Sequence, residues 1–373
     1  MRTVAHFANP YLPLTMTWMY GQIAHLRRYR PVVLTQCVQH LDQFPVTPIY
    51  SAEYFPFAKR VANRILRKAL DRYPFYTDIL KREQVDVLHA HFGQEGCRTL
   101  LAKRRTGLPM VTTFYGLDVS LLPRRPYWRR RFRELFAVGE LFLAEGATLR
   151  ERLMALGCPG KKVIVQHLGV DLDRIQYRAR TPKEGVTFLV CASFREKKGI
   201  RYAVEAFSRI CKEYPKARLR IIGDGPLRGE IVQKIRDLDL GEQVDLLGIQ
   251  PYERLLEEMS RCDLFLQPSV TALDGDTEGG APVVLIEAQA SGMPVVATRH
   301  ADIPEVVRDG ISGFLVPERD VEALADRMAY LLGHPEGWEE MGRAGRAHVE
   351  QEYDVRVQVD RLEAWYDLVV DGG

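Results

Sequence analysis

The regular alternation of apolar, β-rich runs with helix-length amphipathic segments most limits the folds open to this chain. Twelve runs have the length and apolar content of buried strands. Six lie in the first half (3–8, 32–37, 86–92, 110–116, 141–146 and 163–169) and six in the second (186–193, 217–223, 244–248, 263–269, 294–298 and 313–317). Strands that alternate with helices form βαβ units, whose parallel sheets are covered on both faces. The chain is therefore predicted to be an α/β protein.

A polar segment between Gly169 and Gly185 interrupts the alternation and separates the two series of strands. A chain of 373 residues commonly forms two domains. We predict two Rossmann-like, doubly wound domains at 1–172 and 173–350, with a C-terminal helix in 351–373 that packs back on the first domain. Ligands of such sheets bind at the carboxyl ends of the strands. Functional residues are therefore expected in loops that follow strands, at a cleft between the domains.

The composition is that of a soluble globular protein, with 46% hydrophobic and 27% charged residues. The sequence contains no apolar run of about 18 residues that could span a membrane, and the N-terminus lacks the apolar core of a signal peptide. Six scattered cysteines show no metal-type spacing, which favours reduced thiols. These features predict a cytoplasmic protein.

The net charge of +3 hides a strong asymmetry between the two halves. Residues 1–180 contain 29 basic and 14 acidic residues, and residues 181–373 contain 23 basic and 35 acidic residues. A basic half favours an anionic partner. Two basic stretches with interleaved aromatic residues, 54–76 and 121–135, fit the interface of an anionic membrane. A solvated amphipathic helix is the simpler explanation of each, and no nucleic-acid-binding module is visible. We expect peripheral attachment to the inner face of a membrane and no nucleic-acid partner.

The stretch Asp274–Thr298 combines an acidic loop, a helix and a strand. Pro282 suits the first helical position, and Gly292 suits the residue just past the helix end. Gly279 and Gly280 precede the helix and allow a ligand to approach the backbone closely. The unpaired amides of a helix N-terminus attract anions. This stretch therefore predicts an anion-binding cradle.

Charged side chains surround the predicted cradle. The carboxylates of Glu278 and Glu287 flank the helix start, so the ligand is expected to carry hydroxyl groups as well as phosphate, as a nucleotide sugar does. Arg195, Lys197 and Lys198 follow the strand at 186–193 and could clamp a diphosphate. A solvated charge cluster explains the three cations equally well.

Two strand ends in the first half carry further candidates. His89 and His91 occupy alternate positions on one strand and therefore point to the same face. They could face a ligand or be core histidines, and because no third ligand is evident, no metal site is predicted. Tyr115 and Asp118 follow the next strand, where they could meet a substrate hydroxyl. Tyr115 could equally be a packing aromatic residue.

Longer motifs resemble those of a known family. The segments FREKKG, IIGDGPL, CDLFLQPSV, EGGAPVVLIEAQASGMPVVAT and IPEVVRDGISGFLVPERD, with DVLHAHFG and TTFYGLDVS in the first half, resemble retaining family-4 glycosyltransferases of the GT-B fold. The resemblance covers nearly the whole chain, and it is greatest to bacterial enzymes of exopolysaccharide, colanic-acid and lipopolysaccharide assembly. It implies two Rossmann-like domains that face each other across a cleft.

The resemblance also implies an activity. Such enzymes transfer a hexose from a nucleotide diphosphate sugar, here expected to be UDP-linked, to a saccharide or lipid-linked acceptor. They generally need no metal ion and no other cofactor. Lys198 would contact the diphosphate, Glu287 the ribose and Glu278 the transferred sugar. The expected site also includes Arg195, Tyr115, Gly279, Gly280, Ala281, Val283, Val284, Leu247, Gly248, Asp118 and His91.

Three positions depart from the family pattern. Eight residues, rather than seven, separate the two glutamates, so Glu278 fills the first position only if its loop bulges by one residue. Ser193 stands where the family has an arginine, for which Arg195 is the natural substitute, and Tyr115 replaces a common histidine. A nucleotide-sugar-binding subunit with impaired catalysis and a GT-B epimerase therefore stay open as alternatives. A hydrolase with a glutamate pair fits the βαβ architecture less well.

Overall fold

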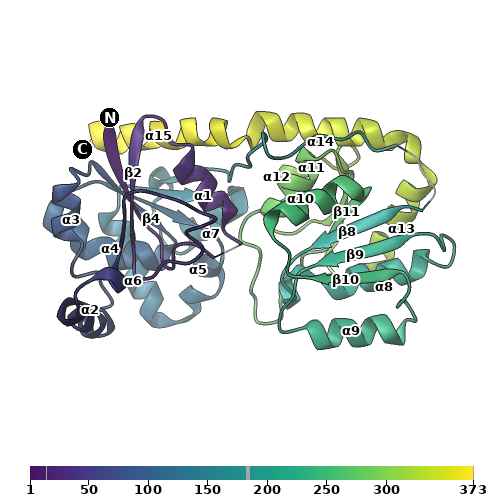
Figure 1. Ribbon diagram of the computed structural model, residues 1–373, viewed down its shortest axis with the longest axis horizontal. Coiled ribbons are helices and arrows are strands. Elements are labelled where there is room, and N and C mark those ends of the chain that lie inside the picture. Colours follow the sequence, from purple (N-terminus) through teal and green to yellow (C-terminus); the bar gives the residue numbers. More distant parts are fainter. Residues whose placement is uncertain (14, 182–184, 373) are drawn as a thin grey trace. The chain divides into compact units, whose positions relative to one another are not determined.

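The computed structural model describes residues 1–13, 15–181 and 185–372, and it contains two compact units (Figure 1). Unit 1 comprises Met1–Gly169 together with the C-terminal segment that begins at Val355. Unit 2 comprises Val170–Asp354. Each unit contains one parallel β-sheet with helices, so the predicted α/β class is confirmed.

Unit 1 is built on a seven-stranded sheet of order β3-β2-β1-β4-β5-β6-β7, in which all neighbours are parallel. The strands are β1 (Arg2–Phe7), β2 (Tyr29–Thr35), β3 (Ile49–Ser51), β4 (Val87–His91), β5 (Met110–Phe114), β6 (Leu141–Ala144) and β7 (Val163–Val165). The helices are α1 (Thr17–Ala24), η1 (Ala52–Tyr54), α2 (Phe57–Leu70), α3 (Thr77–Arg82), α4 (Gly93–Thr106), α5 (Leu117–Ser120), η2 (Leu122–Arg124), α6 (Pro126–Val138), α7 (Ala147–Ala155), η3 (Gly160–Lys162) and α15 (Val355–Asp371).

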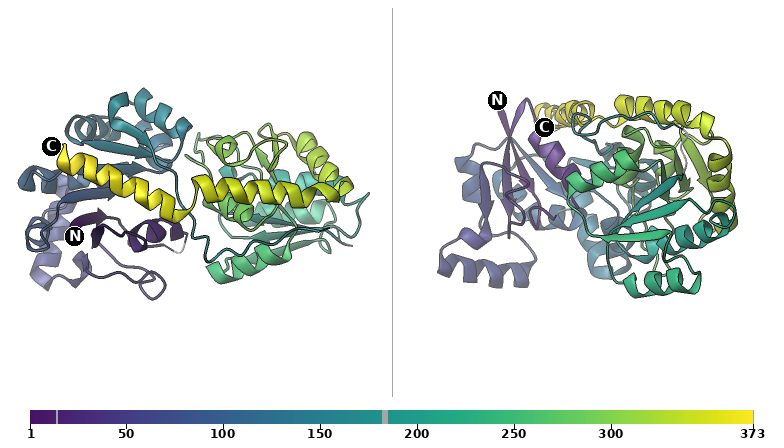
Figure 2. Two further views of the ribbon diagram at one scale, coloured as in Figure 1. Left: turned by 90° about the horizontal axis from the view of Figure 1, so that it is seen from above. Right: turned by 45° about the vertical axis from the view of Figure 1, so that its right-hand side comes forward.

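The last helix, α15, covers one face of the unit 1 sheet. Its residues Leu362, Tyr366 and Val369 form a buried apolar cluster with Val4 and Val111 of the sheet. It packs against β4, β5 and α1, and Figure 2 shows it in yellow beside the purple N-terminal segment. A helix from the end of the chain therefore completes the core of the N-terminal unit.

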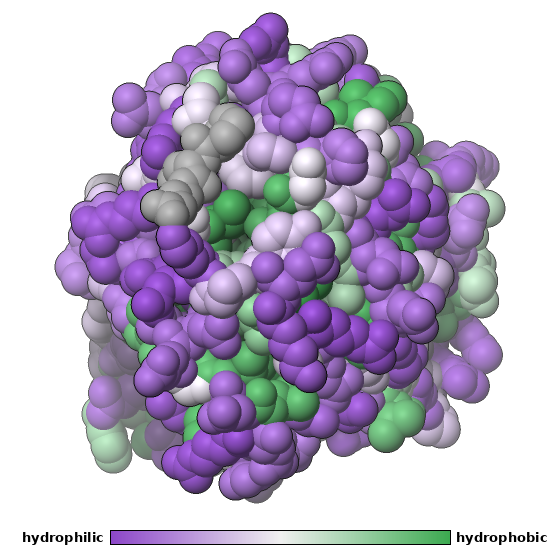
Figure 3. Space-filling view, turned by 90° about the vertical axis from the view of Figure 1, so that its right-hand side faces the viewer, coloured by the Kyte–Doolittle hydropathy of each residue, from purple (hydrophilic) through white to green (hydrophobic). Residues whose placement is uncertain are grey.

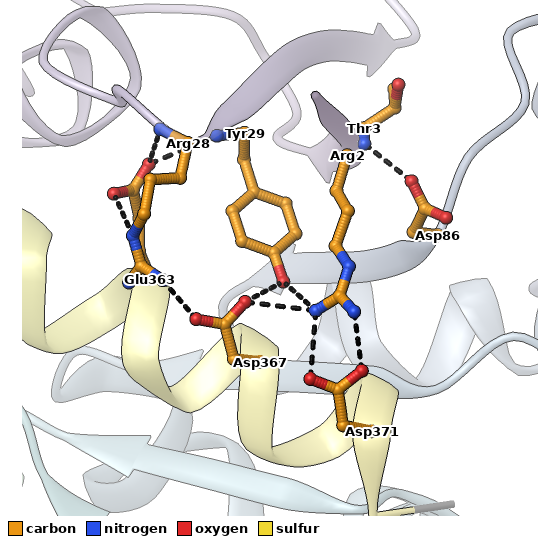
Figure 4. Close-up of polar contacts among 8 residues, drawn as sticks. All are labelled: Arg2, Thr3, Arg28, Tyr29, Asp86, Glu363, Asp367 and Asp371. Carbon is orange, nitrogen blue, oxygen red and sulfur yellow. Dashed lines mark hydrogen bonds and ion pairs between the residues drawn. The ribbon is translucent and has the colours of Figure 1, made fainter.

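A network of hydrogen bonds and ion pairs fixes α15 to the first two strands (Figure 4). The buried carboxylate of Glu363 accepts hydrogen bonds from the backbone N–H groups of Arg28 (2.7 Å) and Tyr29 (3.2 Å). Asp367 accepts from the Tyr29 hydroxyl at 2.8 Å and pairs with Arg2 at 3.1 Å. These contacts position α15 by specific polar groups as well as by its apolar face.

Unit 2 has a six-stranded parallel sheet of order β10-β9-β8-β11-β12-β13. Its strands are β8 (Thr187–Cys191), β9 (Arg218–Ile222), β10 (Val244–Gly248), β11 (Leu264–Gln267), β12 (Val295–Thr298) and β13 (Gly313–Val316). Its helices are η4 (Glu196–Lys198), α8 (Ile200–Ile210), α9 (Arg228–Asp237), α10 (Tyr252–Arg261), α11 (Val283–Ala290), α12 (Ile303–Val306), α13 (Val321–Gly333), η5 (Pro335–Gly337) and α14 (Trp338–Glu352).

The molecular surface is mainly polar on the face that Figure 3 shows, where hydrophobic side chains form separate areas between hydrophilic ones. Among the residues that the structure describes, no helix is both long enough and apolar enough to cross a membrane.

Candidate functional site

The strand order of unit 2 reverses between β8 and β11. From this point β9 and β10 extend the sheet on one side, and β12 and β13 extend it on the other. Ligands of open α/β sheets bind outside the carboxyl ends of the strands at such a switch point. The segment with Lys198 follows β8, and the segment from Ser269 to Glu278 follows β11. The topology therefore brings the predicted cation and the first predicted carboxylate to one edge of the sheet.

Lys198 and Glu278 form a largely buried ion pair at this edge. The Lys198 Nζ lies 2.6 Å from Oε2 of Glu278, whose side chain is only 5% exposed. The Ser269 hydroxyl donates to Oε1 at 2.6 Å, and the Glu278 N–H donates to Nε2 of His300 at 3.1 Å. Burial raises the pKa of Glu278, but Lys198 and Ser269 outweigh it and hold the pKa below its ordinary value. Glu278 is therefore an ionised carboxylate at neutral pH.

Glycines shape the loops on either side of this pair. Gly199, directly after Lys198, has a φ of +63°, and a Cβ there would lie 1.8 Å from the carbonyl oxygen of Pro268. Only glycine lets this turn pack against the end of β11. Gly279 also has a positive φ, of 89°. This turn directly follows Glu278, whose side chain contacts Lys198.

The second carboxylate, Glu287, lies on α11 and is 4% exposed. Burial raises its pKa to about 7, whereas its hydrogen bond with the Tyr252 hydroxyl and the nearby Arg174 guanidinium act in the opposite direction. Arg174 also stacks over the Tyr252 ring, 4.6 Å from the ring centre. Glu287 is therefore poised to gain or lose a proton near neutral pH.

Helix α11 begins at Val283, one residue later than predicted, so Pro282 lies immediately before the helix and not at its first position. The ψ of 129° at Pro282 is that of an extended backbone and not of a helix, so Pro282 is the last residue of the loop. The amides at the start of a helix have no partner within the helix. Four half-buried apolar residues pack against the core cluster that contains Leu285 and Ile286 of α11, namely Leu247, Ala281, Val283 and Val284.

Arg195 does not join the ion pair. It is exposed and lines a cavity of about 150 Å³ together with residues of α8 and α9, including Arg201 and Lys234. The side chains that line this cavity do not include Lys198 or Glu278.

In unit 1, the predicted residues Asp118 and His91 are both fully buried. Asp118 accepts hydrogen bonds from the backbone N–H groups of Gly93 (2.9 Å), Tyr115 (3.1 Å) and Gly116 (2.9 Å). Burial raises its pKa to about 6, and these N–H groups oppose the rise. Asp118 therefore ties together the loops after β4 and β5, so a part in substrate binding would be indirect.

The histidine pair of β4 has a third member that the sequence did not suggest. His6 on β1 is the register partner of His89, and all three imidazoles, with His91, are fully buried. Their ring nitrogens lie close enough together that the trio could hold a metal ion. They also hydrogen-bond to each other and to neighbouring hydroxyls, as core histidines do.

Three residues of the unit 2 site were missed at the level of sequence. Ser269 and His300 each follow a strand of unit 2, so the rule that loops after strands carry the site would have selected both. Tyr252 starts a helix, and no local pattern connects it to Glu287.

The two basic stretches differ in structure. Helix α2 exposes Phe57 (73%), Val61 (40%) and Ile65 (61%), whereas its only buried residue in the described structure is the polar Asn63. In the second stretch the aromatic side chains of Trp128 and Phe132 are buried in the core cluster of unit 1. Of the three aromatic residues in that stretch, only Tyr127 is exposed (50%), so the stretch offers less aromatic surface than its sequence suggested.

Comparison with known proteins identifies related sequences and folds. The family models "Glycosyltransferase Family 4" and "Glycosyl transferases group 1" match residues 19–174 and 173–348. The putative colanic acid biosynthesis glycosyltransferase WcaL of Salmonella typhimurium is 37% identical over 248 residues, which cover 65% of this chain and 61% of WcaL. The amylovoran biosynthesis glycosyltransferase AmsK of Erwinia amylovora is 34% identical over 286 residues, which cover 74% of this chain and 69% of AmsK.

Solved structures agree on the fold. Anabaena Alr3699/HepE, in a crystal structure with UDP and glucose, has a TM-score of 0.79 at 17% identity, with 98% of this chain and 99% of HepE covered. At this identity the likeness concerns the fold alone, and it confirms the predicted GT-B architecture. The AmsK match covers more than two thirds of that relative, and the two family models together span most of the chain. The chain therefore belongs to the glycosyltransferase family that these two models describe.

Proposed function

We propose that this protein is a retaining, metal-independent hexosyltransferase. It would move a hexose from a nucleotide diphosphate sugar to a saccharide or lipid-linked acceptor during assembly of a cell-surface polysaccharide. The observation that carries the proposal is the buried Lys198–Glu278 pair at the switch point of unit 2, five residues before the start of α11. The names of the WcaL and AmsK relatives support the polysaccharide context, and the UDP complex of HepE supports a UDP-linked donor.

Lys198 and the start of α11 are proposed to stabilise the leaving diphosphate. Negative charge develops on the diphosphate as the sugar departs, and fixed cations and amides lower the energy of that state. Lys198 supplies an ammonium group, and Val283 and Val284 supply amides without helical partners. Glu278 holds Lys198 in place before the donor binds. Arg195 could supply a second cation to the diphosphate if its side chain left the cavity that it lines with residues of α8 and α9.

Glu287 is proposed to bind the ribose. Its carboxylate can accept hydrogen bonds from two neighbouring hydroxyl groups, and the Tyr252 hydroxyl keeps it oriented. The base would lie near Leu247 and Gly248 at the end of β10. Glu278, with the backbone of Gly279 to Ala281, would contact the transferred sugar. In unit 1 the β5–α5 loop is the candidate for further substrate contacts, which Tyr115 would make, while Asp118 holds the loop in place.

A thermal-shift screen of UDP-, GDP- and ADP-sugars tests the donor site. We expect one UDP-sugar to raise the melting temperature, Tm, and we expect Glu287→Gln to reduce that shift strongly. Glu339→Gln, at an exposed position on α14, is the control and should keep the shift. A response to GDP-sugars alone would show that the donor carries guanine in place of uracil. No response to any donor would overturn the proposal.

Product analysis by NMR tests the reaction itself. An extended acceptor that keeps the donor's anomeric configuration supports retaining transfer, and an inverted product refutes retention. An epimerised donor supports the GT-B epimerase. Donor binding without turnover on any acceptor supports an impaired binding subunit. Lys198→Ala should abolish turnover, and full activity of this variant would remove Lys198 from the site.

We further propose that α2 attaches unit 1 to an anionic lipid surface. Phe57, Val61 and Ile65 form an exposed apolar stripe along the helix, and α2 has five cations and no acidic residue. Asn63 on the inner side bonds to Gln36 at 2.8 Å, so the polar side of the helix, and not its apolar stripe, faces the protein. An apolar stripe flanked by cations is the pattern of an interfacial helix.

Vesicle co-sedimentation distinguishes α2 from the second basic stretch. Vesicles with about a third anionic lipid should bind the protein, and neutral vesicles should not. The double variant Val61→Ser/Ile65→Ser should lose most of the binding. Arg124→Gln/Arg130→Gln, in the stretch with a buried aromatic side, should keep it. Equal loss in both variants would show a general charge effect and would refute a specific role of α2.

A further inference from the structure

Six buried polar side chains form one connected hydrogen-bonded chain through unit 1. They come from β1, β4, β5, the loop after β5 and the last helix, and they are His6, His89, His91, Thr113, Tyr115 and Tyr366. Such a set of polar groups in a core is stable only when its donors and acceptors are matched. The pattern of hydrogen bonds therefore restricts where each proton lies.

The order of contacts along the chain is unambiguous. His6 Nδ1 and His91 Nε2 share a hydrogen bond of 3.0 Å, and His91 Nδ1 and the Tyr115 hydroxyl share one of 2.6 Å. Tyr115 is hydrogen-bonded to Thr113. Thr113 Oγ1 lies 2.7 Å from His89 Nε2.

Tyr366 and His6 form the two ends. His89 Nδ1 lies 2.6 Å from the Tyr366 hydroxyl. At the other end, Nε2 of His6 has no hydrogen-bond partner among the described residues.

All three imidazoles are neutral. Burial lowers the pKa of His6 to about 3, and burial together with the neighbouring imidazoles lowers the pKa of His89 and His91 well below the ordinary value. A neutral imidazole carries one N–H donor and one bare acceptor nitrogen. Each histidine between two partners must donate to one and accept from the other, and a hydroxyl between two partners uses its single proton only when it donates to one of them. Two directions therefore satisfy every group inside the chain.

In the first direction, Tyr115 donates its proton to His91 and accepts from Thr113. His91 then donates to His6, and Tyr366 donates to His89. This arrangement leaves one unpaired donor, the Nε2–H of His6.

In the reverse direction, His91 donates to Tyr115. The end nitrogen of His6 is then a bare acceptor, and the proton of Tyr366 has no acceptor among the described residues, so two groups are unpaired. Each unpaired buried polar group is unfavourable. The first direction should therefore dominate by roughly tenfold or more.

We propose that His6 and His91 are positioning residues that hold Tyr115 and commit its hydroxyl proton to the protein interior. Tyr115 then offers a ligand its ring and not a proton. The ring is 8% exposed and packs against Trp18, with 4.3 Å between the ring centres. The link to a ligand rests on the proposed transferase function, whereas the direction of the hydrogen bonds does not depend on it.

A divalent transition metal is the competing occupant of the histidine trio, since neutral imidazoles are good ligands for such ions. An ion coordinated by the facing nitrogens of His6 and His91 would replace the 3.0 Å hydrogen bond between them. Five of the six ring nitrogens already have hydrogen-bond partners within the described structure. The hydrogen-bonded chain therefore accounts for these contacts without a metal ion.

The imidazole ¹⁵N spectrum of histidine-labelled protein tests the direction, with signals assigned by single substitution. In the wild-type protein we expect His89 and His91 as Nε2–H tautomers, at tenfold or greater excess. Tyr115→Phe should bring both His91 and His89 close to an equal mixture, because it removes the donor to His91 and the acceptor of the Thr113 proton. Tyr366→Phe should also bring both close to an equal mixture, because no Tyr366 proton then disfavours the reverse direction. Tyr127→Phe, whose hydroxyl bonds to Asp71 at 2.8 Å outside this chain, is the control and should leave both histidines unchanged.

Three results would overturn the proposal: Nδ1–H on wild-type His91, an unchanged His91 in Tyr115→Phe, or about one bound zinc ion per chain that is lost in His6→Ala. Metal content is measured by atomic spectroscopy after incubation with zinc chloride and desalting. If a tyrosine variant fails to fold, the wild-type spectrum alone decides, because the two directions place the proton on different nitrogens of His91. No donor or acceptor is needed, so failure of the transferase assignment remains a separate result.

Discussion

Replacement of Lys198 by methionine removes the cation of the buried pair and leaves the Glu278 carboxylate without its main partner. Loss of one member of a buried ion pair typically costs 3–5 kcal/mol. Lys198 is 18% exposed, and Ser269 still donates to Glu278 at 2.6 Å, so we expect the lower end, about 3 kcal/mol. Unit 2 has 185 residues, for which 1 kcal/mol corresponds to about 2–4 °C in Tm. The Tm of unit 2 should therefore fall by about 6–12 °C.

Differential scanning calorimetry of a double-mutant cycle at pH 7.5 measures this effect. Glu278→Gln in the Lys198→Met background removes the stranded charge and should restore at least half of the lost Tm. Arg343→Met breaks an exposed pair on α14, with exposures of 70% and 50%, and should leave Tm nearly unchanged. If Lys198→Met has the Tm of the wild-type protein, or the second substitution restores nothing, the pair is not the buried charge pair described here.

Three further predictions concern Glu287, a glycine turn and the last helix. Burial raises the pKa of Glu287 to about 7 from 4.5, so the folded protein holds a proton that the unfolded chain has released, and stability falls as pH rises between these values. Glu287→Gln should remove roughly 3 kcal/mol of this pH-dependent fall in the free energy of unfolding. The measurement is the Tm of the variant minus the Tm of the wild-type protein, taken at pH 5 and at pH 7.5. The same Tm difference at both pH values would contradict the prediction. Gly199→Ala should lower Tm, because of its φ of +63° and its close carbonyl, whereas Gly229→Ala, with open space around its Cβ, should leave Tm unchanged or higher. Glu363→Ala should speed amide hydrogen exchange in α15 at least tenfold, and Asp360→Ala, 59% exposed on the same helix, should not; similar exchange in both would show that the buried carboxylate does not fix the helix.

Local pattern was sufficient for most of the fold. Every predicted strand overlaps a strand of the structure, because buried parallel strands are continuous apolar runs, although β1 and β2 begin one and three residues earlier than predicted. The strand β3 was missed because Ile49–Ser51 is only three residues long and lies at the sheet edge. The burial of Trp128 and Phe132 on α6 was also missed. Periodicity shows that a helix has an apolar side, but it does not show whether that side is buried.

The candidate site was predictable only where it follows the strand rule. Lys198 and Glu278 come together because each follows a strand at the switch point, which the order of strands dictates. The contact of Tyr252 with Glu287 and the meeting of His6 with His91 depend on the packing of segments far apart in the sequence. No spacing rule reports such contacts.

The position of α15 has a consequence for biosynthesis. Chains leave the ribosome from the N-terminus, and domains generally fold as they emerge. Unit 1 cannot do so in full, because part of its core and the partners of Arg2, Tyr29 and His89 lie on a helix that is made after all of unit 2. During synthesis the face of the first sheet that α15 later covers is therefore an exposed apolar surface. We expect nascent chains that end before Val355 to bind a chaperone such as a ribosome-associated holdase, and full-length chains to release it.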